Sequence, residues 1–213
     1  KGRPGWHIEC SAMSSKYLGD NIDIHSGGVD LMFPHHENEA AQSEAASNSG
    51  KPFVNYWLHN GFINIDNEKM SKSLGNAILM KDVVSQFGGI PFRMMILAAH
   101  YRAPASFSEE TIKEAQKKYL QLVSGVKAAA IALQLADIDI DALPAMEDNK
   151  VIDALCDDLN TPNALSALYE ANKELNMALR ARPLDLDALK KAYSLVRDEE
   201  DVLGIIIPIP HLN

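Results

Sequence analysis

The segment Glu68-Lys69-Met70-Ser71-Lys72-Ser73-Leu74-Gly75-Asn76 places two lysines three residues apart, with serines beside them and a glycine close behind. Lysine binds phosphate oxygens as a point charge, and serine hydroxyls and loop amides add hydrogen bonds to the same oxygens. Such a loop suits a reaction in which negative charge builds up on a polyphosphate leaving group. A solvent-facing turn is the alternative for an isolated pair of lysines, so the flanking sequence has to decide.

The sequence before this loop alternates between helical and extended patterns. Residues 5–19 predict a short loop and a helix that stops at a glycine, and residues 22–25 alternate like a strand. Pro34 fits the first position of a helix over residues 35–47, and residues 56–65 are rich in aromatic and β-branched side chains. Strand, glycine turn, helix and strand in this order predict an α/β sheet whose ligands lie beyond the carboxyl ends of its strands.

Behind the loop the pattern becomes helical. A long amphipathic helix is predicted over residues 108–136, with Ser108 as its cap and acidic residues in its first turn. An acidic linker over residues 137–144 separates this helix from three more, and leucines at helical spacing within residues 165–179 predict that they form a bundle. The helices expected after the loop cover residues 80–87, 92–99, 108–136, 147–158, 163–181 and 185–203.

Composition and charge narrow the class of protein. No apolar run is long enough for a membrane span, so no membrane partner is expected. The first residues show neither a Met nor a signal-peptide pattern, so the chain is expected to be the middle of a longer protein. The chain has only two cysteines, which favours location in the reducing cytoplasm. The net charge is −9, of which residues 108–213 carry −8. Because an acidic surface neutralises phosphates poorly, most of any nucleic-acid-binding surface is expected to lie elsewhere.

Three residues in the first forty have the chemistry of metal ligands: Cys10, His35 and Glu39. His35 and Glu39 are four residues apart, so both side chains leave the same face of the predicted helix. A thiolate, an imidazole and a carboxylate are all zinc ligands, and three protein ligands with an open position are typical of a catalytic zinc. No paired-cysteine spacing supports the site, so a coincidental grouping stays open at this point.

The chain resembles the cysteinyl-tRNA synthetases, which are class I aminoacyl-tRNA synthetases. Its Lys69-Met70-Ser71-Lys72-Ser73 sequence is similar to the second signature of that class, a loop that closes over ATP. Further matching segments stand in the family's order and extend the similarity over almost the whole chain. These segments are residues 5–11, 27–39, 58–62, 100–108 and 157–162.

The resemblance implies an α/β fold, the second half of a class I Rossmann-type catalytic domain, followed by an all-α helical bundle. Residues 1–66 would belong to the catalytic domain, residues 67–107 to the lysine loop and connecting helices, and residues 108–213 to a bundle of the tRNA-binding type. The family's His-Ile-Gly-His signature and its C-terminal tail have no match in these 213 residues. An interior fragment of a synthetase is therefore expected.

The resemblance also implies roles for individual side chains. One zinc ion would be held by Cys10, His35 and Glu39, with a second cysteine from the preceding half of the domain. The substrate cysteine would meet Trp6 and Asp30, and Asp30 would pair with its ammonium group. The ATP phosphates would be contacted by Lys69, Ser71 and Lys72, and the two lysines would also be catalytic. The wall of the pocket on the nucleotide side would consist of Glu9, Gly61 and Phe62.

The function that the resemblance implies is ATP-dependent activation of cysteine to cysteinyl-adenylate, followed by transfer to tRNA(Cys). ATP would act with Mg²⁺, zinc would select the substrate thiolate, and the protein would be a cytoplasmic monomer. The isolated fragment is expected to be inactive. Two alternatives stay open: the cysteine ligase of mycothiol biosynthesis, which uses an amino-sugar acceptor, and a non-catalytic zinc-binding paralogue.

The remaining polar residues are given supporting roles. His25, His59, His100 and Arg102 are expected to be structural or supporting, since polar residues near the ends of a sheet commonly satisfy backbone groups. His36 and Glu37 are candidates for support of the metal ligands. A further expectation concerns Cys156, which stands among apolar residues of a predicted helix and is interpreted as a buried structural thiol.

Overall fold

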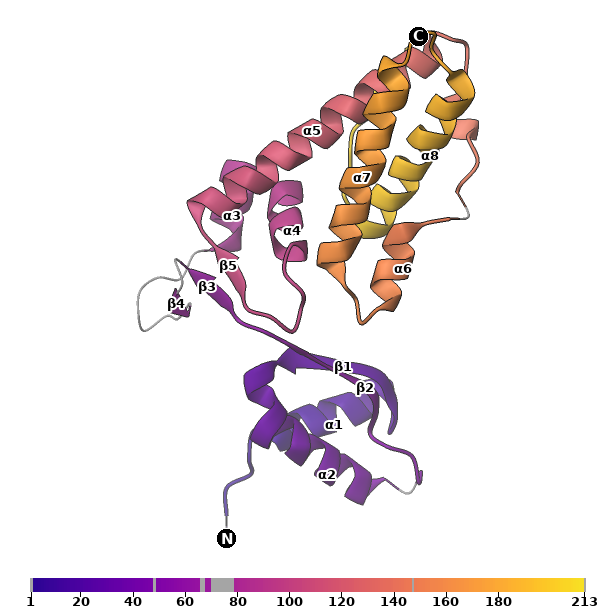
Figure 1. The fold of residues 1–213 in the computed structure, drawn as a ribbon. Coiled ribbons are helices and arrows are strands. Elements are labelled where there is room, and N and C mark those ends of the chain that lie inside the picture. The colour runs from indigo at the N-terminus through magenta and orange to yellow at the C-terminus, as the bar shows by residue number, and fades with distance from the viewer. Residues whose placement is uncertain (1, 48, 66–67, 70–78, 147, 213) are drawn as a thin grey trace. The chain divides into compact units, whose positions relative to one another are not determined.

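The computed structural model describes residues 2–47, 49–65, 68–69, 79–146 and 148–212 (Figure 1). The chain forms two compact units. The first comprises Lys1–Ile63 and Tyr101–Pro104, and the second comprises Asn64–His100 and Ala105–Asn213. A parallel pair of strands with helices is followed along the chain by a set of helices, which confirms the expected α/β fold with a helical bundle behind it.

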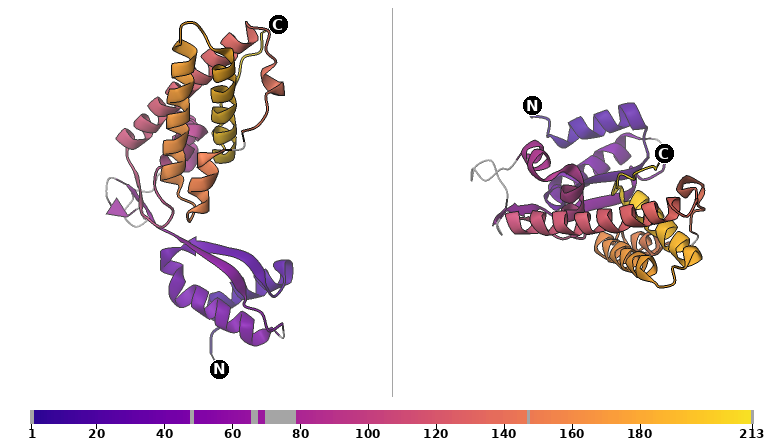
Figure 2. Two further views of the ribbon diagram at one scale, coloured as in Figure 1. Left: turned by 45° about the vertical axis from the view of Figure 1, so that its right-hand side comes forward. Right: turned by 90° about the horizontal axis from the view of Figure 1, so that it is seen from above.

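The first unit is built on two parallel strands, β1 (Ile22–Gly28) and β2 (Val54–Asn60). Their register runs from Ile22 opposite Val54 to Gly28 opposite Asn60, so both strands end at the same edge. Helices α1 (His7–Leu18) and α2 (Glu37–Ala46) pack against each other, and Figures 1 and 2 show both on one side of the strands. The carboxyl ends of the strands therefore open toward the segment that leads into α2.

That segment differs from the helix start predicted at Pro34. A 3-10 turn (Val29–Leu31) and a π-type turn (Met32–His36) precede α2, and Phe33 within the second turn is extended, with φ −135° and ψ 133°. The residue before a proline is sterically pushed out of the α conformation. Regular α-helix therefore begins only at Glu37, after the turn has brought two adjacent histidines to the strand ends.

The single strand expected over residues 56–65 is also wrong, because β2 ends at Asn60 and β3 (Ile63–Ile65) follows separately. Gly61 lies at the break, and its N–H donates a 2.7 Å hydrogen bond to the carbonyl of Tyr101. A Cβ atom at Gly61 would lie 2.4 Å from the carbonyl oxygen of Ala103. Only a glycine allows two backbones to approach this closely.

The second unit is dominated by helices. Its longest helix, α5, packs against α4, α7 and α8, and α6 packs against α7 and α8. Strand β3 lies between β4 and β5 in a small three-stranded sheet. The elements are β4 (Glu68–Lys69), α3 (Met80–Phe87), α4 (Gly89–Leu97), β5 (Ala105–Phe107), α5 (Glu109–Gln134), a 3-10 turn (Ile140–Ala142), α6 (Lys150–Cys156), α7 (Thr161–Arg180) and α8 (Leu186–Leu203).

The predicted start and apolar face of α5 are confirmed. Ser108 Oγ accepts a 3.1 Å hydrogen bond from the Thr111 N–H, and Thr111 Oγ1 accepts one of 2.9 Å from the Ser108 N–H. This capping box satisfies two backbone donors that a helix start leaves open. The apolar face is completely buried in the bundle at Ile112, Val126 and Leu133.

The expectation for Cys156 is wrong, because its side chain is exposed. Helix α6 turns its buried face toward the bundle at Val151, which is fully buried. Cys156 follows Val151 by five residues, and at 3.6 residues per turn it points about 140° away from it. Among the helices that the structure describes, none has the length and apolar character needed to cross a membrane.

Candidate metal centre

The structure brings together the three residues with metal-ligand chemistry. Cys10 comes from α1, His35 from the turn before α2, and Glu39 from the first turn of α2. One ligand atom of each lies within 4.8 Å of the other two. Cys10, which precedes His35 by 25 positions and Glu39 by 29, thus converges with them on one point, which argues against the coincidental grouping that the sequence left open.

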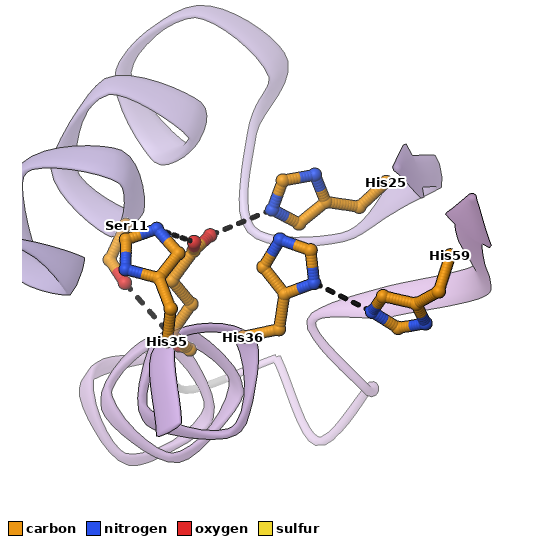
Figure 3. A network of polar contacts seen from close by, with 6 residues as sticks. Ser11, His25, His35, His36 and His59 are labelled. Carbon is orange, nitrogen blue, oxygen red and sulfur yellow. Dashed lines mark hydrogen bonds and ion pairs between the residues drawn. The ribbon is translucent and has the colours of Figure 1, made fainter. Parts of the chain in front are cut away.

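Glu39 is the centre of the group, and its side chain is fully buried. Its Oε1 atom lies 2.8 Å from His35 Nε2, and its Oε2 atom lies 2.8 Å from His25 Nε2, with which it is hydrogen bonded (Figure 3). Oε1 makes no hydrogen bond to any residue that the structure describes, because the His35 ring is close but not aligned for one. A buried carboxylate oxygen without a hydrogen bond is costly. Glu39 Oε1 and His35 Nε2 are therefore positioned to share a cation between them.

The thiol of Cys10 belongs to the same environment. Burial raises its pKa, and the negative charges of Glu39 and Glu9 raise it further. Because a metal ion binds the thiolate, a cation between Cys10 and Glu39 would reverse this effect. Ser11 Oγ, next to Cys10, donates a 3.3 Å hydrogen bond to the backbone oxygen of Glu39 and holds α1 against α2.

A group of histidine side chains lies beside Glu39 and packs around the Trp57 ring. His36 is buried, and its Nδ1 atom lies 2.8 Å from Nε2 of His59 (Figure 3). The ring of Trp57 lies 4.9 Å from the His25 ring and 5.0 Å from the His36 ring. Burial lowers the pKa of His36 to about 4, and the positive charge of protonated His25 lowers it too, whereas Glu39 acts in the opposite direction.

Only part of this group of side chains is predictable from the sequence. His36 was expected to support the metal ligands and lies next to them, but Glu37, proposed for the same role, is exposed. His25 and His59 were expected to be structural or supporting, and their side chains contact Glu39 and His36, respectively. The signal that could have found them is their position at the carboxyl ends of two parallel strands. The backbone role is seen for His100, whose Nε2 lies 2.9 Å from the carbonyl oxygen of Asp158.

The residues expected to contact cysteine and ATP differ in their exposure and in their distance from the metal ligands. Trp6 is 61% exposed, and its ring lies 4.1 Å from that of His35, next to the metal ligands. Asp30 and Glu9 are exposed, and Gly61 and Phe62 are half-buried. Lys69 belongs to strand β4, whereas Ser71 and Lys72 lie outside the described residues. Their proposed contacts with ATP therefore stay predictions.

Comparison with known families assigns most of the chain to two domains. Residues 1–117 match the family described as "tRNA synthetases class I (C) catalytic domain", and residues 150–207 match the "DALR domain". The chain belongs to this family of class I tRNA synthetases.

Its relatives within that class carry a more specific name and confirm the resemblance to the cysteinyl-tRNA synthetases. The cysteine--tRNA ligase of Halalkalibacterium halodurans is 45% identical over 212 residues, which cover 97% of this chain and 45% of the relative. That of Acinetobacter baumannii is 46% identical over 205 residues, covering 96% of this chain and 42% of the relative. The chain spans slightly less than half the length of these curated relatives.

A solved structure supports the fold alone. The LeuRS of Agrobacterium radiobacter K84, crystallised as a ternary complex with tRNA and LeuAMS, superimposes with a TM-score of 0.63 at 16% identity. The match covers 86% of this chain and 26% of the LeuRS chain. The similarity thus agrees with the fold class of the chain.

Proposed function

We propose that the protein to which this chain belongs activates cysteine with ATP and transfers it to tRNA(Cys). The observation that carries the proposal is the convergence of Cys10, His35 and Glu39, whose ligand atoms lie within 4.8 Å of one another. This convergence lies in the part of the chain that matches the class I catalytic domain. Relatives that share 45% identity with the chain are named cysteine--tRNA ligases.

The three residues fit a zinc ion by their chemistry. A thiolate, an imidazole and a carboxylate form a mixed set of zinc ligands, and the unpartnered Oε1 of buried Glu39 supplies a free acceptor. Zinc bound there would take the sulfur of the substrate as a thiolate, which favours cysteine over serine because a hydroxyl binds such a site poorly. The hydrogen bond from His25 fixes the rotation of the Glu39 carboxylate, and Trp6 covers the His35 ring.

The remaining roles concern the two substrates. Asp30 is exposed, as a residue that pairs with the ammonium group of free cysteine has to be. We assign the ATP phosphates to Lys69, Ser71 and Lys72, where lysine charges stabilise the departing pyrophosphate, with Mg²⁺ as counter-ion. Glu9, Gly61 and Phe62 are assigned to the nucleotide side of the pocket.

The proposal also concerns the state of the protein. Relatives are about twice as long as this chain, so the 213 residues alone are expected to be inactive. Because residues 108–213 are acidic, we expect most of the tRNA-binding surface to lie outside them. A cytoplasmic monomer is the state that we expect.

The experiment that tests the function uses the complete gene product, labelled cysteine and ATP, and two acceptors offered in parallel: tRNA and glucosaminyl-inositol. Label in acid-precipitable tRNA is the expected result. Label in the amino-sugar instead would contradict the tRNA assignment and favour the mycothiol-pathway ligase. Transfer to neither acceptor, with zinc still bound, would favour a non-catalytic zinc-binding protein.

A further inference from the structure

A second set of metal-ligand atoms lies beside the first and shares Glu39 with it, and the proposed function gives this set no metal of its own. His25, His36 and Glu39 each offer one ligand atom, and these atoms also lie within 4.8 Å of one another. Two imidazoles and a carboxylate form a recognised donor set for first-row divalent metals. We propose that these three residues form a second site for a divalent transition metal, and that the two sites share the Glu39 carboxylate.

The geometry around Glu39 supports a shared carboxylate. Oε1 faces His35 at 2.8 Å and Oε2 faces His25 at 2.8 Å, so the two oxygens point to different histidines. Figure 3 shows His35 on one side of this carboxylate and His25 on the other. A carboxylate that bridges two ions about 3.5–4 Å apart is common in two-metal sites. The two donor sets therefore do not compete for one oxygen.

The ring of His36 is held in the orientation that is typical of metal-ligating histidines. Its Nδ1 atom is hydrogen bonded to His59, which leaves Nε2 as the atom available to a metal. Ligating histidines usually use their second nitrogen in such an outer hydrogen bond, which fixes the orientation of the ring. His36 is only 4% exposed, so its ring is confined to this arrangement.

Gly27 on β1 gives His36 the space that it needs. A Cβ atom at this position would lie 2.9 Å from Cε1 and 3.2 Å from Nε2 of the His36 ring. The absent side chain thus leaves room for the ring at the end of β1, two residues after His25. The site is built from β1, the turn before α2, and α2 itself.

The second site differs from the first in its donors, because it contains nitrogen and oxygen but no sulfur. It is therefore expected to accept Co²⁺, Ni²⁺ or Zn²⁺, and to bind them more weakly when the first site is filled, since two cations then lie close together. The proposal goes beyond the proposed function and does not depend on cysteine, ATP or tRNA. Its test separates the two sites by removing the thiol.

The experiment measures Co²⁺ binding to the 213-residue chain by titration calorimetry and by visible and near-ultraviolet absorption. Co²⁺ bound to Cys10 gives a sulfur-to-metal charge-transfer band, whereas the second site gives only weak visible bands. In Cys10→Ser, the charge-transfer band is lost, and binding without this band is expected to remain. Adding His36→Gln to Cys10→Ser is expected to weaken that binding at least ~tenfold.

The matched control is His35→Gln in the same Cys10→Ser background, because His35 is the adjacent buried histidine and belongs to the first set. It is expected to leave the remaining binding unchanged. If Cys10→Ser binds no Co²⁺, or if His35→Gln and His36→Gln weaken its binding equally, the second site is refuted.

Folding of His36→Gln is checked in the chain that retains Cys10. The charge-transfer band is expected to persist there, since the first site keeps all three ligands. If this band is lost as well, His25→Gln replaces His36→Gln in both backgrounds, and the same comparison with His35→Gln decides.

Discussion

His25 Nε2 lies 2.8 Å from Glu39 Oε2, although one residue is on strand β1 and the other is on helix α2. This contact fixes the carboxylate so that its other oxygen faces His35. The relation explains why a fully buried glutamate is tolerated in a small unit with few apolar core residues. The strand pair, rather than α2 alone, therefore sets the orientation of the metal ligands.

Replacing Glu39 by Gln is expected to weaken Zn²⁺ binding by about 100-fold or more, because loss of even a supporting partner costs 10–100-fold. The amide keeps the size of the side chain but loses its charge. Zn²⁺ affinity of the 213-residue chain is measured by competition with a chromogenic chelator. Glu37→Gln is the matched control, because Glu37 is an exposed residue of the same helix. Equal affinities of the two variants would contradict the role of Glu39.

Zn²⁺ affinity is expected to rise with pH. Burial, Glu39 and Glu9 raise the pKa of the Cys10 thiol, so below that pKa the free chain holds a proton that the metal must displace. One proton released per ion corresponds to about a tenfold gain in affinity per pH unit from this group. Competition titrations between pH 6 and pH 8 measure the slope. Cys10→Ser is expected to lower it, and an unchanged slope would exclude Cys10 as a ligand.

In the bundle, Leu168→Ala is expected to destabilise the second unit by about 2–5 kcal/mol. Leu168 of α7 is fully buried, so its truncation removes buried apolar surface and leaves a cavity. Met177→Ala on the same helix is the control, since Met177 is 64% exposed and its loss is expected to cost little. Urea unfolding followed by circular dichroism gives both free energies of unfolding. Similar values would contradict the packing of α7.

Stability of the second unit is expected to fall as pH rises from about 5 to 8. Burial raises the pKa of Glu200 to about 8, although the neighbouring Arg197 acts in the opposite direction. The folded state then holds a proton that the unfolded state has released above its ordinary pKa of about 4.3, so this contribution to stability is present at low pH and lost as pH rises through the folded pKa.

The same urea experiment, repeated across this pH range, tests the prediction. Glu200→Gln is expected to flatten the dependence, because glutamine does not titrate. The control Glu170→Gln alters an exposed carboxylate of α7 and is expected to leave the slope unchanged. A Glu200→Gln chain that keeps the full slope would refute the assignment. Glu199, whose pKa burial raises to about 7, would be the next residue to replace.

Gly61→Ala is expected to destabilise the first unit by about 1–3 kcal/mol, a typical cost of overpacking. Its Cβ atom would lie 2.4 Å from the backbone oxygen of Ala103, which has no flexible side chain to move aside. Gly89→Ala is the control, because no atom lies within 4 Å of a Cβ at that position. Thermal unfolding measures both. A neutral Gly61→Ala would contradict the close approach of the two backbones at this position.

Much of the fold follows from local patterns. The capped start of α5 and its apolar face depend on residues three or four positions apart, which a sequence displays directly. The i,i+4 spacing of His35 and Glu39 likewise places both ligands on one side of the chain. Cys10 could be joined to them only through family resemblance, because no short-range spacing links α1 to α2.

The errors have a different physical origin. The break at Gly61 arises from a contact with Ala103, 42 residues later, which local propensity does not contain. The exposure of Cys156 depends on which face α6 turns toward the bundle. The pairing of His25 with Glu39 depends on the register of β1 and the irregular turn before α2. Each is a tertiary relation between elements that the sequence predicted separately.

The aromatic contacts of the metal centre give the first unit its own optical reporters. The chain has two tryptophans: the Trp6 ring lies 4.1 Å from that of His35, and Trp57 lies beside His25 and His36. Both belong to the first unit, so intrinsic fluorescence excited in the indole band reports on that unit without a signal from the helical bundle. Co²⁺ quenches this fluorescence, so it can be titrated into the two single-tryptophan chains. Trp57→Phe would report binding near His35, and Trp6→Phe would report binding near His25 and His36.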